Sequence, residues 1–417
     1  MSILKRLSKS WSDLTTIFTR NEVEIDINNS SEQNTNVGEP LNSCSVLKSG
    51  TKKVSPPSLA NIGANCYLNS ALQSISSCEK FKEDIKRLHS KYKDLDKLTL
   101  FHNLMIVLNN GSKNAIEISR NNIFRHWNKS GQQDSFELLA YVINQVYNEI
   151  RNHSEVKNDI SGWLRIRLPM KLLIQYSIKC SCGTIISIPL HSDLALHISV
   201  PRNGNETLER CLDQHFTDDI ILNYICDTKS CAGLNALKMT KLLRPLPQTL
   251  CIHLQKSYWN GYQMKKINNR INFSAELIIK SEYCHTIDEI DSELLKSISN
   301  NSSITFSKAL SKSSDSEKSL IGKGISLQKS FPSIKDNVIN NLRLTSINSG
   351  EHLKQKKNIL YNLCSVIVHK GNVKGGHYMC YKCIDNQWYL ADDNQISKVR
   401  KEIVFKSDPY ILIYEEK

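Results

Sequence analysis

Hydrophobic and polar positions alternate with two periods along the chain, first that of helices and then that of strands. Between residues 56 and about 160, apolar residues recur every three to four positions, most regularly over Gln132–Ile150. One face of that predicted helix is apolar throughout: Phe136, Leu139, Ala140, Ile143, Val146, Tyr147 and Ile150. A stripe of this width is typical of a helix packed against a core.

Short alternating runs bounded by turn residues follow, and they predict antiparallel strands. The first group, between about 164 and 285, comprises Leu172–Ile178, Thr184–Ile188, Leu194–Val200 and Leu250–Leu254. The last sixty residues contain Leu360–His369, a glycine-containing loop at Lys370–Gly376, His377–Cys383, a turn at Asp385 and Asn386, Trp388–Asn394 and Tyr410–Tyr414. We expect this last group to form an antiparallel meander.

Two segments interrupt these patterns and predict disordered chain. Residues 28–40 and about 287–357 are rich in Ser and Asn and poor in apolar residues. Residues 1–20 differ, because apolar positions from Ile3 to Phe18 recur at helical spacing among basic residues. That pattern fits a helix making weak peripheral contact with a membrane surface, or a mitochondrial address, and equally a solvated tail.

The composition narrows the class of protein. The chain has 417 residues, 13 cysteines and a net charge of +13. Cysteines in this number without a secretory signal indicate reduced thiols used for metal binding or catalysis. The basic residues are spread out, so the charge fits a solvated surface better than nucleic-acid binding. No apolar stretch approaches the roughly 20 residues that span a bilayer.

Cys66 is the first candidate for catalytic chemistry. Asn61, Gly63 and Asn65 before it are turn formers, and an apolar helical pattern begins at Tyr67. The cysteine therefore lies where a loop becomes a helix, and there the free N–H groups and the helix dipole favour a thiolate. The alternative is a buried structural cysteine, because Cys usually behaves as a small hydrophobic residue.

A histidine and a carboxylate near the end of the chain form a second candidate. His377 begins one predicted strand and Asp392 ends the next, so a short turn places the two side by side. A carboxylate in that position fixes the imidazole tautomer and stabilises the imidazolium. His377 is therefore a better candidate for a functional histidine than an isolated one.

Two cysteine pairs among the first strands predict a metal site. Cys180 with Cys182, and Cys226 with Cys231, would bring four thiolates together around a tetrahedral zinc ion if they lie on facing hairpins. One and four residues separate the members of the pairs, where two is commonest, so ordinary hairpin cysteines are the alternative.

Asp134 and Glu137 lie three residues apart at the start of the helix predicted over Gln132–Ile150. Such carboxylates usually satisfy the positive end of the helix dipole. They could equally grip a cationic group of a bound peptide.

Three segments resemble the ubiquitin-specific proteases, a family of cysteine deubiquitinases, and they occur in the family's order. They are the cysteine box Asn61–Ser70, the intervening segment Gln132–Leu139, and the histidine box Gly375–Tyr378 with Trp388, Asp392 and Asp393. In addition, Leu246–Lys256 is similar to a strand of the family's mitochondrial outer-membrane member. Ala64 and Asn65 depart from the family's common Asn and Thr, and the cysteine spacing departs from its usual zinc ribbon.

The resemblance implies a papain-like α+β fold over residues 56–417, after an N-terminal segment 1–55 outside the core. The parts are a helical thumb at about 56–160, β-ribbon fingers at about 161–245, an antiparallel β palm at about 246–286 and 358–417, and a disordered insertion at about 287–357.

The resemblance also implies roles for individual residues. Cys66 would be the nucleophile, His377 the general base and then acid, and Asp392 the residue that orients the imidazole, with Asp393 as a substitute. Asn61 would donate to the oxyanion together with the Cys66 N–H. The residues in contact with the tail of ubiquitin would be Asp134, Glu137, Gly376 and Tyr378.

We therefore expect hydrolysis of the isopeptide bond at the C-terminal glycine of ubiquitin, with ubiquitin and ubiquitinated proteins as partners. No catalytic cofactor is expected, and zinc would be structural. The protein is expected to be a monomer in the cytoplasm or at the cytosolic face of the mitochondrial outer membrane. The alternative is a catalytically silent ubiquitin-binding scaffold.

Overall fold

The computed structural model describes residues 57–61, 63–91, 99–109, 111–127, 129, 131–152, 168–187, 191–222, 224–226, 231, 235–286, 357–373 and 375–417. Contacts divide the chain into Met1–Val54 and a larger unit, Ser55–Lys417. The helix predicted in residues 1–20 and nearly all of the insertion predicted at about 287–357 lie outside the described residues. Of the helices within them, none is both long and apolar enough to cross a membrane.

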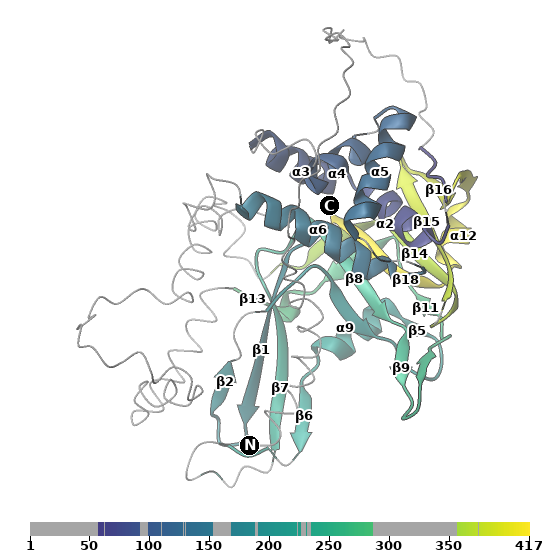
Figure 1. The fold of residues 1–417 in the computed structure, drawn as a ribbon. Coiled ribbons are helices and arrows are strands. Elements are labelled where there is room, and N and C mark those ends of the chain that lie inside the picture. The colour runs from purple at the N-terminus through teal and green to yellow at the C-terminus, as the bar shows by residue number, and fades with distance from the viewer. Residues whose placement is uncertain are drawn as a thin grey trace, which may run out of the picture. The chain divides into compact units, whose positions relative to one another are not determined.

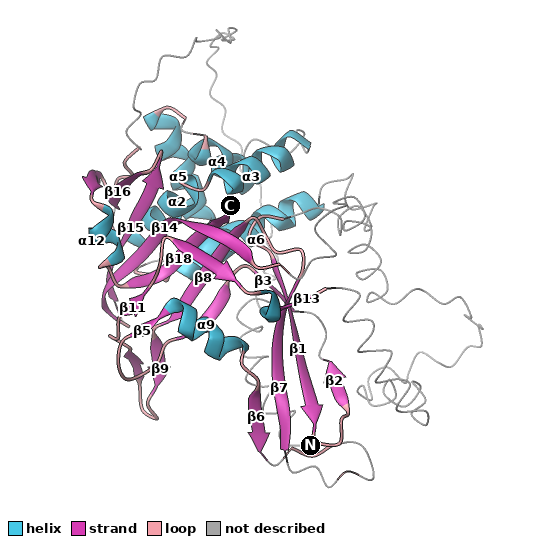
Figure 2. Cartoon of the chain, turned by 180° about the vertical axis from the view of Figure 1, so that it is seen from behind, coloured by secondary structure: helices cyan, strands magenta, loops and turns pink. Residues whose placement is uncertain are grey.

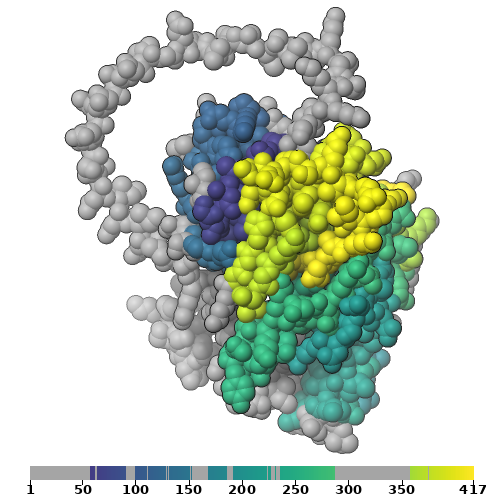
Figure 3. Space-filling view, turned by 90° about the vertical axis from the view of Figure 1, so that its right-hand side faces the viewer, coloured from purple at the N-terminus to yellow at the C-terminus, as the bar shows by residue number. Residues whose placement is uncertain are grey.

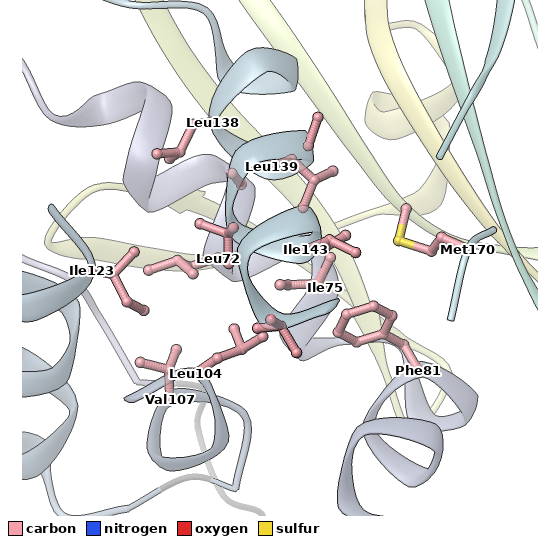
Figure 4. Close-up of a cluster of buried hydrophobic side chains, with 14 of the residues drawn as sticks. Leu72, Ile75, Phe81, Leu104, Val107, Ile123, Leu138, Leu139, Ile143 and Met170 are labelled. Carbon is pink, nitrogen blue, oxygen red and sulfur yellow. The ribbon is translucent and has the colours of Figure 1, made fainter. Parts of the chain in front are cut away.

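Five described helices from the first part of the chain pack together: α2 (Cys66–Ser76), α3 (Glu79–Lys91), α4 (Leu100–Leu108), α5 (Lys113–Trp127) and α6 (Ser135–Asn152). Helix α2 is the central one, because all its residues except the last are buried. Figure 4 shows side chains of α2 between those of its neighbours: Leu72, Ile75, Leu104, Ile123, Leu139 and Ile143. This packing fixes the helix that begins at Cys66.

An eight-stranded sheet packs against α2 and carries the C-terminal strands. Its order is β17-β16-β15-β14-β18-β8-β4, and β12 also pairs with β14. The strands are β4 (Leu196–Ser199), β8 (Thr249–Gln255), β12 (Glu276–Ile279), β14 (Ile359–Asn372), β15 (Gly375–Ile384), β16 (Gln387–Asp392), β17 (Gln395–Val399) and β18 (Pro409–Glu416). Figure 3 shows the yellow C-terminal strands packed beside the purple segment that contains α2.

A second sheet forms a long ribbon that projects away from the helices, as Figures 1 and 2 show for β1 and β7. Its order is β13-β7-β1-β2, with β3 paired to β1 and β6 to β7. The strands are β1 (Leu172–Cys180), β2 (Ile185–Ser187), β3 (His191–Asp193), β6 (Asp219–Leu222), β7 (Asn235–Leu243) and β13 (Cys284–His285). β1 and β7 pair antiparallel from Ile174 opposite Leu242 to Cys180 opposite Ala236.

Smaller elements lie in the connections between these strands. Two short strand pairs are β5 (Glu206–Thr207) with β11 (Ile271–Asn272), and β9 (Ser257–Trp259) with β10 (Met264–Lys266). The helices among them are α9 (Leu208–Phe216), η1 (Ser281–Tyr283) and α12 (Lys401–Phe405).

The prediction that all these strands are antiparallel is wrong for β4. This strand runs parallel to β8, with Leu196 opposite Ile252. Between the two, the chain leaves the sheet to form α9, β6 and β7, and a parallel neighbour requires such a long connection. The palm sheet is therefore mixed.

The predicted meander is confirmed for β14, β15 and β16, but the closing strand β18 returns to pair with β14 on the side away from β15. The first loop of the meander is also shorter than expected. Strands β14 and β15 remain paired to Asn372 opposite Gly375, so most of the predicted loop is strand. Gly371 makes this close pairing possible, because its φ is +136° and a Cβ there would lie 2.5 Å from the Gly375 carbonyl oxygen.

Candidate active site

The start of α2 lies at Cys66, as the loop-to-helix pattern predicted. Gly63 has a φ of +101°, which a residue with a side chain rarely adopts. Asn65 precedes the helix, and its N–H donates to the side-chain oxygen of Asn61 at 3.0 Å. The loop thereby folds back on itself just before the cysteine.

The Cys66 thiol lies under β15, the strand that carries His377. The backbone N–H of Tyr378, the residue directly after His377, lies close enough to the sulfur to lower the pKa of Cys66. Cys66 as a whole residue is 2% exposed. Burial raises the pKa of Cys66, and the N–H groups of Tyr378 and Tyr67 offset this only in part.

The N–H groups at the start of α2 lower the pKa of Cys66, as the sequence predicted, but burial outweighs them. Removal from water disfavours the anion more than the nearby N–H groups favour it. The negative charge of Asp393 acts in the same direction as burial. A nucleophile in this position needs a base to take its proton.

His377 and Asp392 meet as the hairpin prediction required. The Nε2 of His377 lies 2.6 Å from Oδ1 of Asp392. The two come from β15 and β16, whose register includes Cys380 opposite Ala391. Because an ionised carboxylate only accepts hydrogen bonds, this contact puts a proton on Nε2 and leaves Nδ1 as the basic nitrogen of the ring.

Asp393 has different partners from Asp392. Its Oδ2 accepts from the Asn61 side-chain amide at 2.8 Å, and its Oδ1 accepts from the Asn69 amide at 2.8 Å. Its backbone oxygen also accepts from the Leu59 N–H at 3.2 Å. Asp393 therefore fixes the loop that carries Asn61, while one of its oxygens still lies within 4.8 Å of the His377–Asp392 pair.

Other contacts hold the same loop, and the sequence did not reveal them. The Ala60 N–H donates to Glu117 on α5 at 2.9 Å, and Glu117 in turn pairs with the fully buried Arg120 at 2.9 Å. Asn69 also donates to the Ala60 carbonyl at 3.2 Å. In the sequence, the one indication of these contacts was Asn69, a polar residue within the apolar helical pattern that begins at Tyr67. The structure buries Asn69 together with its neighbours.

Asp134 and Glu137 have different environments. Asp134 caps α6, because its Oδ1 accepts from the N–H groups of Phe136 at 2.8 Å and Glu137 at 3.0 Å. Its Oδ2 accepts from the hydroxyls of Tyr378 and Tyr410. The Glu137 side chain is half exposed. Of the pair, only Glu137 extends a carboxylate into solvent.

Gln132 joins the helical part to the strand of His377, a contact that the sequence did not predict. Its Oε1 accepts from the Gly376 N–H at 2.6 Å, and its Nε2 donates to the Gly376 carbonyl. A Cβ on Gly375 would lie 2.7 Å from that Oε1, and one on Gly376 would clash with His369. Both glycines therefore permit the close approach that positions His377.

The four predicted metal ligands converge at the end of the second sheet. The sulfurs of Cys180, Cys182, Cys226 and Cys231 all lie within 4.8 Å of one another. Two of the separations are 3.5 Å, between Cys180 and Cys231, and 3.7 Å, between Cys182 and Cys226. Tetrahedral zinc with bonds of about 2.3 Å needs sulfurs about 3.8 Å apart. The group therefore fits zinc despite its unusual spacing.

Local hydrogen bonds also prepare these thiols for a metal ion. Hydrogen bonds with Thr184 lower the pKa of Cys182 to about 6. The backbone at Cys182 lowers the pKa of Cys180. A lowered pKa favours the thiolate, which is the form that binds metal.

Comparisons with known proteins agree with this geometry. A family model described as ubiquitin carboxyl-terminal hydrolase matches residues 58–414. Probable ubiquitin carboxyl-terminal hydrolase 8 of Schizosaccharomyces pombe is 22% identical over 294 residues, covering 69% of this chain and 46% of the relative. Ubiquitin carboxyl-terminal hydrolase 30 of Xenopus tropicalis is 23% identical over 447 residues, covering 86% and 80%.

Among solved structures, the SAGA Ubp8/Sgf11/Sus1/Sgf73 DUB module bound to ubiquitin aldehyde has a similar fold. The TM-score is 0.61 at 18% identity, over 87% of this chain and 69% of that chain. This likeness confirms the α+β fold class expected from the sequence. The chain spans about half the length of the Schizosaccharomyces pombe relative, and a quarter of ubiquitin carboxyl-terminal hydrolase 47 of Mus musculus.

Proposed function

The chain belongs to the ubiquitin carboxyl-terminal hydrolase family, and from that premise we propose that it is a cysteine-dependent deubiquitinase. Its reaction is hydrolysis of the bond between the C-terminal glycine of ubiquitin and an amine of a conjugated protein. The observation that carries this proposal is the Cys66 sulfur lying against the strand of His377, whose ring is hydrogen-bonded to Asp392.

In the first half of the reaction, His377 takes the proton of Cys66 and the sulfur attacks the carbonyl carbon of the terminal glycine. The carbonyl oxygen becomes an oxyanion, which the Asn61 amide and the Cys66 N–H stabilise. Asn61 retains one amide hydrogen for this task, since the other is donated to Asp393. His377 then protonates the leaving amine, and a thioester between Cys66 and ubiquitin remains.

In the second half, water hydrolyses the thioester. His377 accepts a proton from the attacking water, and a second oxyanion forms in the same position. Its collapse breaks the carbon–sulfur bond and releases ubiquitin with a free C-terminal carboxylate. Asp392 keeps the proton of His377 on Nε2 throughout, which leaves Nδ1 for both transfers.

Substrate binding is assigned to residues around this centre. Glu137 presents a half-exposed carboxylate at the start of α6, where it can hold an arginine of the ubiquitin tail. Asp134 positions α6 and Tyr378 through its four hydrogen bonds. Gly376 and Tyr378 border the tail as it reaches Cys66.

We assign a structural zinc ion to the cluster formed by Cys180, Cys182, Cys226 and Cys231. Four thiolates form a closed coordination shell that leaves no position for a substrate. Zinc there would tie the turn after β1 to the segment before β7, and no step of the reaction depends on it.

A ubiquitin probe with an electrophile in place of its terminal carboxyl group tests the function. We expect the wild-type chain to form one covalent adduct, and Cys66→Ala to form none and to lose cleavage of a ubiquitin–fluorophore. The control Cys211→Ala, on α9, should label as wild type does. A scaffold without activity would bind ubiquitin with no adduct, and turnover by Cys66→Ala would overturn the assignment.

A further inference from the structure

A second group of reactive side chains lies where the helices meet the palm sheet, away from the catalytic residues. The sulfurs of Cys78 and Cys364 and a carboxylate oxygen of Glu415 lie within 4.8 Å of one another. Cys78 follows α2, Cys364 belongs to β14, and Glu415 to β18. We propose that Cys78 and Cys364 form a disulfide in response to hydrogen peroxide, and that this bond cross-links the α2–α3 junction to the palm.

The local backbone brings Cys364 to this position. In the pairing of β14 with β18, Leu363 lies opposite Tyr414 and Ser365 opposite Ile413. Cys364 is therefore the extra residue of a β-bulge. Bulges redirect a side chain out of the regular alternation of a strand, and here the side chain reaches Cys78 and Glu415.

The two thiols differ in access to solvent, as the two members of a redox pair require. Cys364 is half-buried, whereas Cys78 is 0% exposed and hydrogen-bonds the Ser74 carbonyl at 3.3 Å. Burial raises the pKa of Cys78, so this thiol does not meet peroxide as a thiolate. Cys364 is thus the thiol that the oxidant reaches, and Cys78 is the thiol that resolves the product.

The chemistry takes two steps. The Cys364 sulfur, after giving its proton to Glu415 at 3.5 Å, attacks one oxygen of the peroxide. The O–O bond breaks, hydroxide leaves, and a sulfenic acid forms. The Cys78 sulfur then attacks the Cys364 sulfur, the S–O bond breaks, and a second hydroxide leaves. The two thiols lose two electrons to the peroxide, and their protons convert both hydroxides to water.

A metal ion fits this group less well than a disulfide. The carboxylate of Glu415 already accepts from the N–H groups of Glu79 and Phe81, each at 3.1 Å, at the start of α3. In addition, the ammonium of the buried Lys382 lies close enough to Cys78 to interact with its charge. A positive charge in that position opposes the binding of a divalent cation.

Peptide mapping after treatment with hydrogen peroxide tests the proposal. Trypsin places Cys364 in peptide 358–370, but leaves Cys66 and Cys78 together in peptide 54–80. Chymotrypsin cleavage after Tyr67 is therefore needed to separate the two cysteines. We expect a cross-linked peptide pair that contains Cys78 and Cys364, is 2 Da lighter than the two free peptides together, and disappears on reduction.

Four variants make the result decisive. Cys364→Ser and Cys78→Ser should each abolish the cross-link, whereas Cys66→Ala should retain it because the nucleophile takes no part. Cys383→Ser is the matched control, since Cys383 lies on β15 next to Lys382, which pairs with Ser365. A bond between Cys364 and Cys383, or a Cys364 sulfinic acid without any cross-link, would overturn the proposal. A zinc ion that is bound by the wild-type chain and lost in Cys364→Ser would also overturn the proposal.

Thermal unfolding gives an independent reading. A bond between residues so distant in sequence constrains the unfolded chain, so peroxide should raise Tm by about 5 °C or more. The rise should appear in Cys66→Ala, whose nucleophile cannot be oxidised, and should be absent from Cys66→Ala combined with Cys364→Ser. An equal rise in both proteins would contradict the cross-link.

Discussion

At the scale of single residues, the adjacent carboxylates of Asp392 and Asp393 have different hydrogen-bond partners in the site. Asp392 hydrogen-bonds His377, while both oxygens of Asp393 are held by the amides of Asn61 and Asn69. The sequence offered Asp393 as a substitute for Asp392. Its contacts indicate instead that Asp393 is a positioning residue for Asn61, to which we assign the donation to the oxyanion.

Replacement of Asp393 by Ala should therefore lower kcat by about 10²- to 10³-fold with little change in KM, the usual effect of losing one oxyanion donor. Asp393→Asn should retain part of the rate, because its amide oxygen still accepts from Asn61 or Asn69. Kinetics with a ubiquitin–fluorophore measure both variants. Wild-type kcat in Asp393→Ala would show that Asn61 needs no such partner.

The residues that the sequence predicted at this site share a property: each belongs to a local pattern. Cys66 follows turn formers at the start of a helix, and His377 and Asp392 are linked by one hairpin. By contrast, Gln132 hydrogen-bonds Gly376, which lies 244 residues away in the sequence, and Asn69 hydrogen-bonds Asp393, which lies 324 residues away. No local pattern contains such pairs, so only the folded chain shows them.

At the scale of elements, the contact between α2 and β15 encloses a charged group. Lys382 on β15 is 1% exposed, and its ammonium donates to the side chains of Gln73 and Ser76 on α2. Burial lowers the pKa of Lys382 from its usual 10.5 to about 8. Helix α2, which begins at Cys66, therefore packs against a lysine that is charged at neutral pH.

This lysine makes the stability of the protein depend on pH. Between pH 8 and 10.5 the native state has released the proton while the unfolded state still binds it, so stability rises with pH. Relative to Lys382→Met, the wild type should gain about 3 kcal/mol in free energy of unfolding across that range. Urea unfolding of both proteins at several pH values measures the difference between their free energies of unfolding. The other titrating groups are the same in both proteins, so their contributions cancel in that difference. A constant difference would contradict the burial of a charged Lys382.

The sequence predicted an element correctly where a hydrophobic pattern continued over several turns of helix, or where two turn-forming residues marked a hairpin. The apolar stripe predicted α6. The turn formers Asp385 and Asn386, both of which have a positive φ, predicted the β15–β16 hairpin. Helix α9 was missed because its nine residues lie inside a strand-rich region. Strand β7 was missed because its buried and exposed positions do not alternate regularly. The parallel pairing of β4 depends on a distant partner, which a local pattern does not encode.

At the scale of the whole catalytic unit, the palm and the finger ribbon are separate sheets with different tasks. His377 and Asp392 belong to the eight-stranded sheet, while the four-cysteine cluster lies at the end of the six-stranded one, where β1 and β7 extend away from the helices. Few apolar contacts are available at such a tip, where Ile220, Leu222 and Ile225 are exposed. The zinc ion that we propose for the four thiols would therefore be the main means of ordering it.

Removal of zinc should consequently loosen the ribbon and leave the catalytic sheet intact. We expect one zinc per chain in the purified protein, lost with a chelator or in Cys231→Ser but retained in the control Cys211→Ser. Hydrogen exchange should then accelerate in β1, β2, β6 and β7, and remain slow in β14–β16. The resemblance to ubiquitin-specific proteases implies that the fingers cradle ubiquitin. KM should therefore rise while kcat stays within about threefold, the pattern of a lost binding contact. Equal acceleration in both sheets would mean that the metal supports the entire fold, and zinc-free protein with a protected ribbon would mean that the four thiols need no metal.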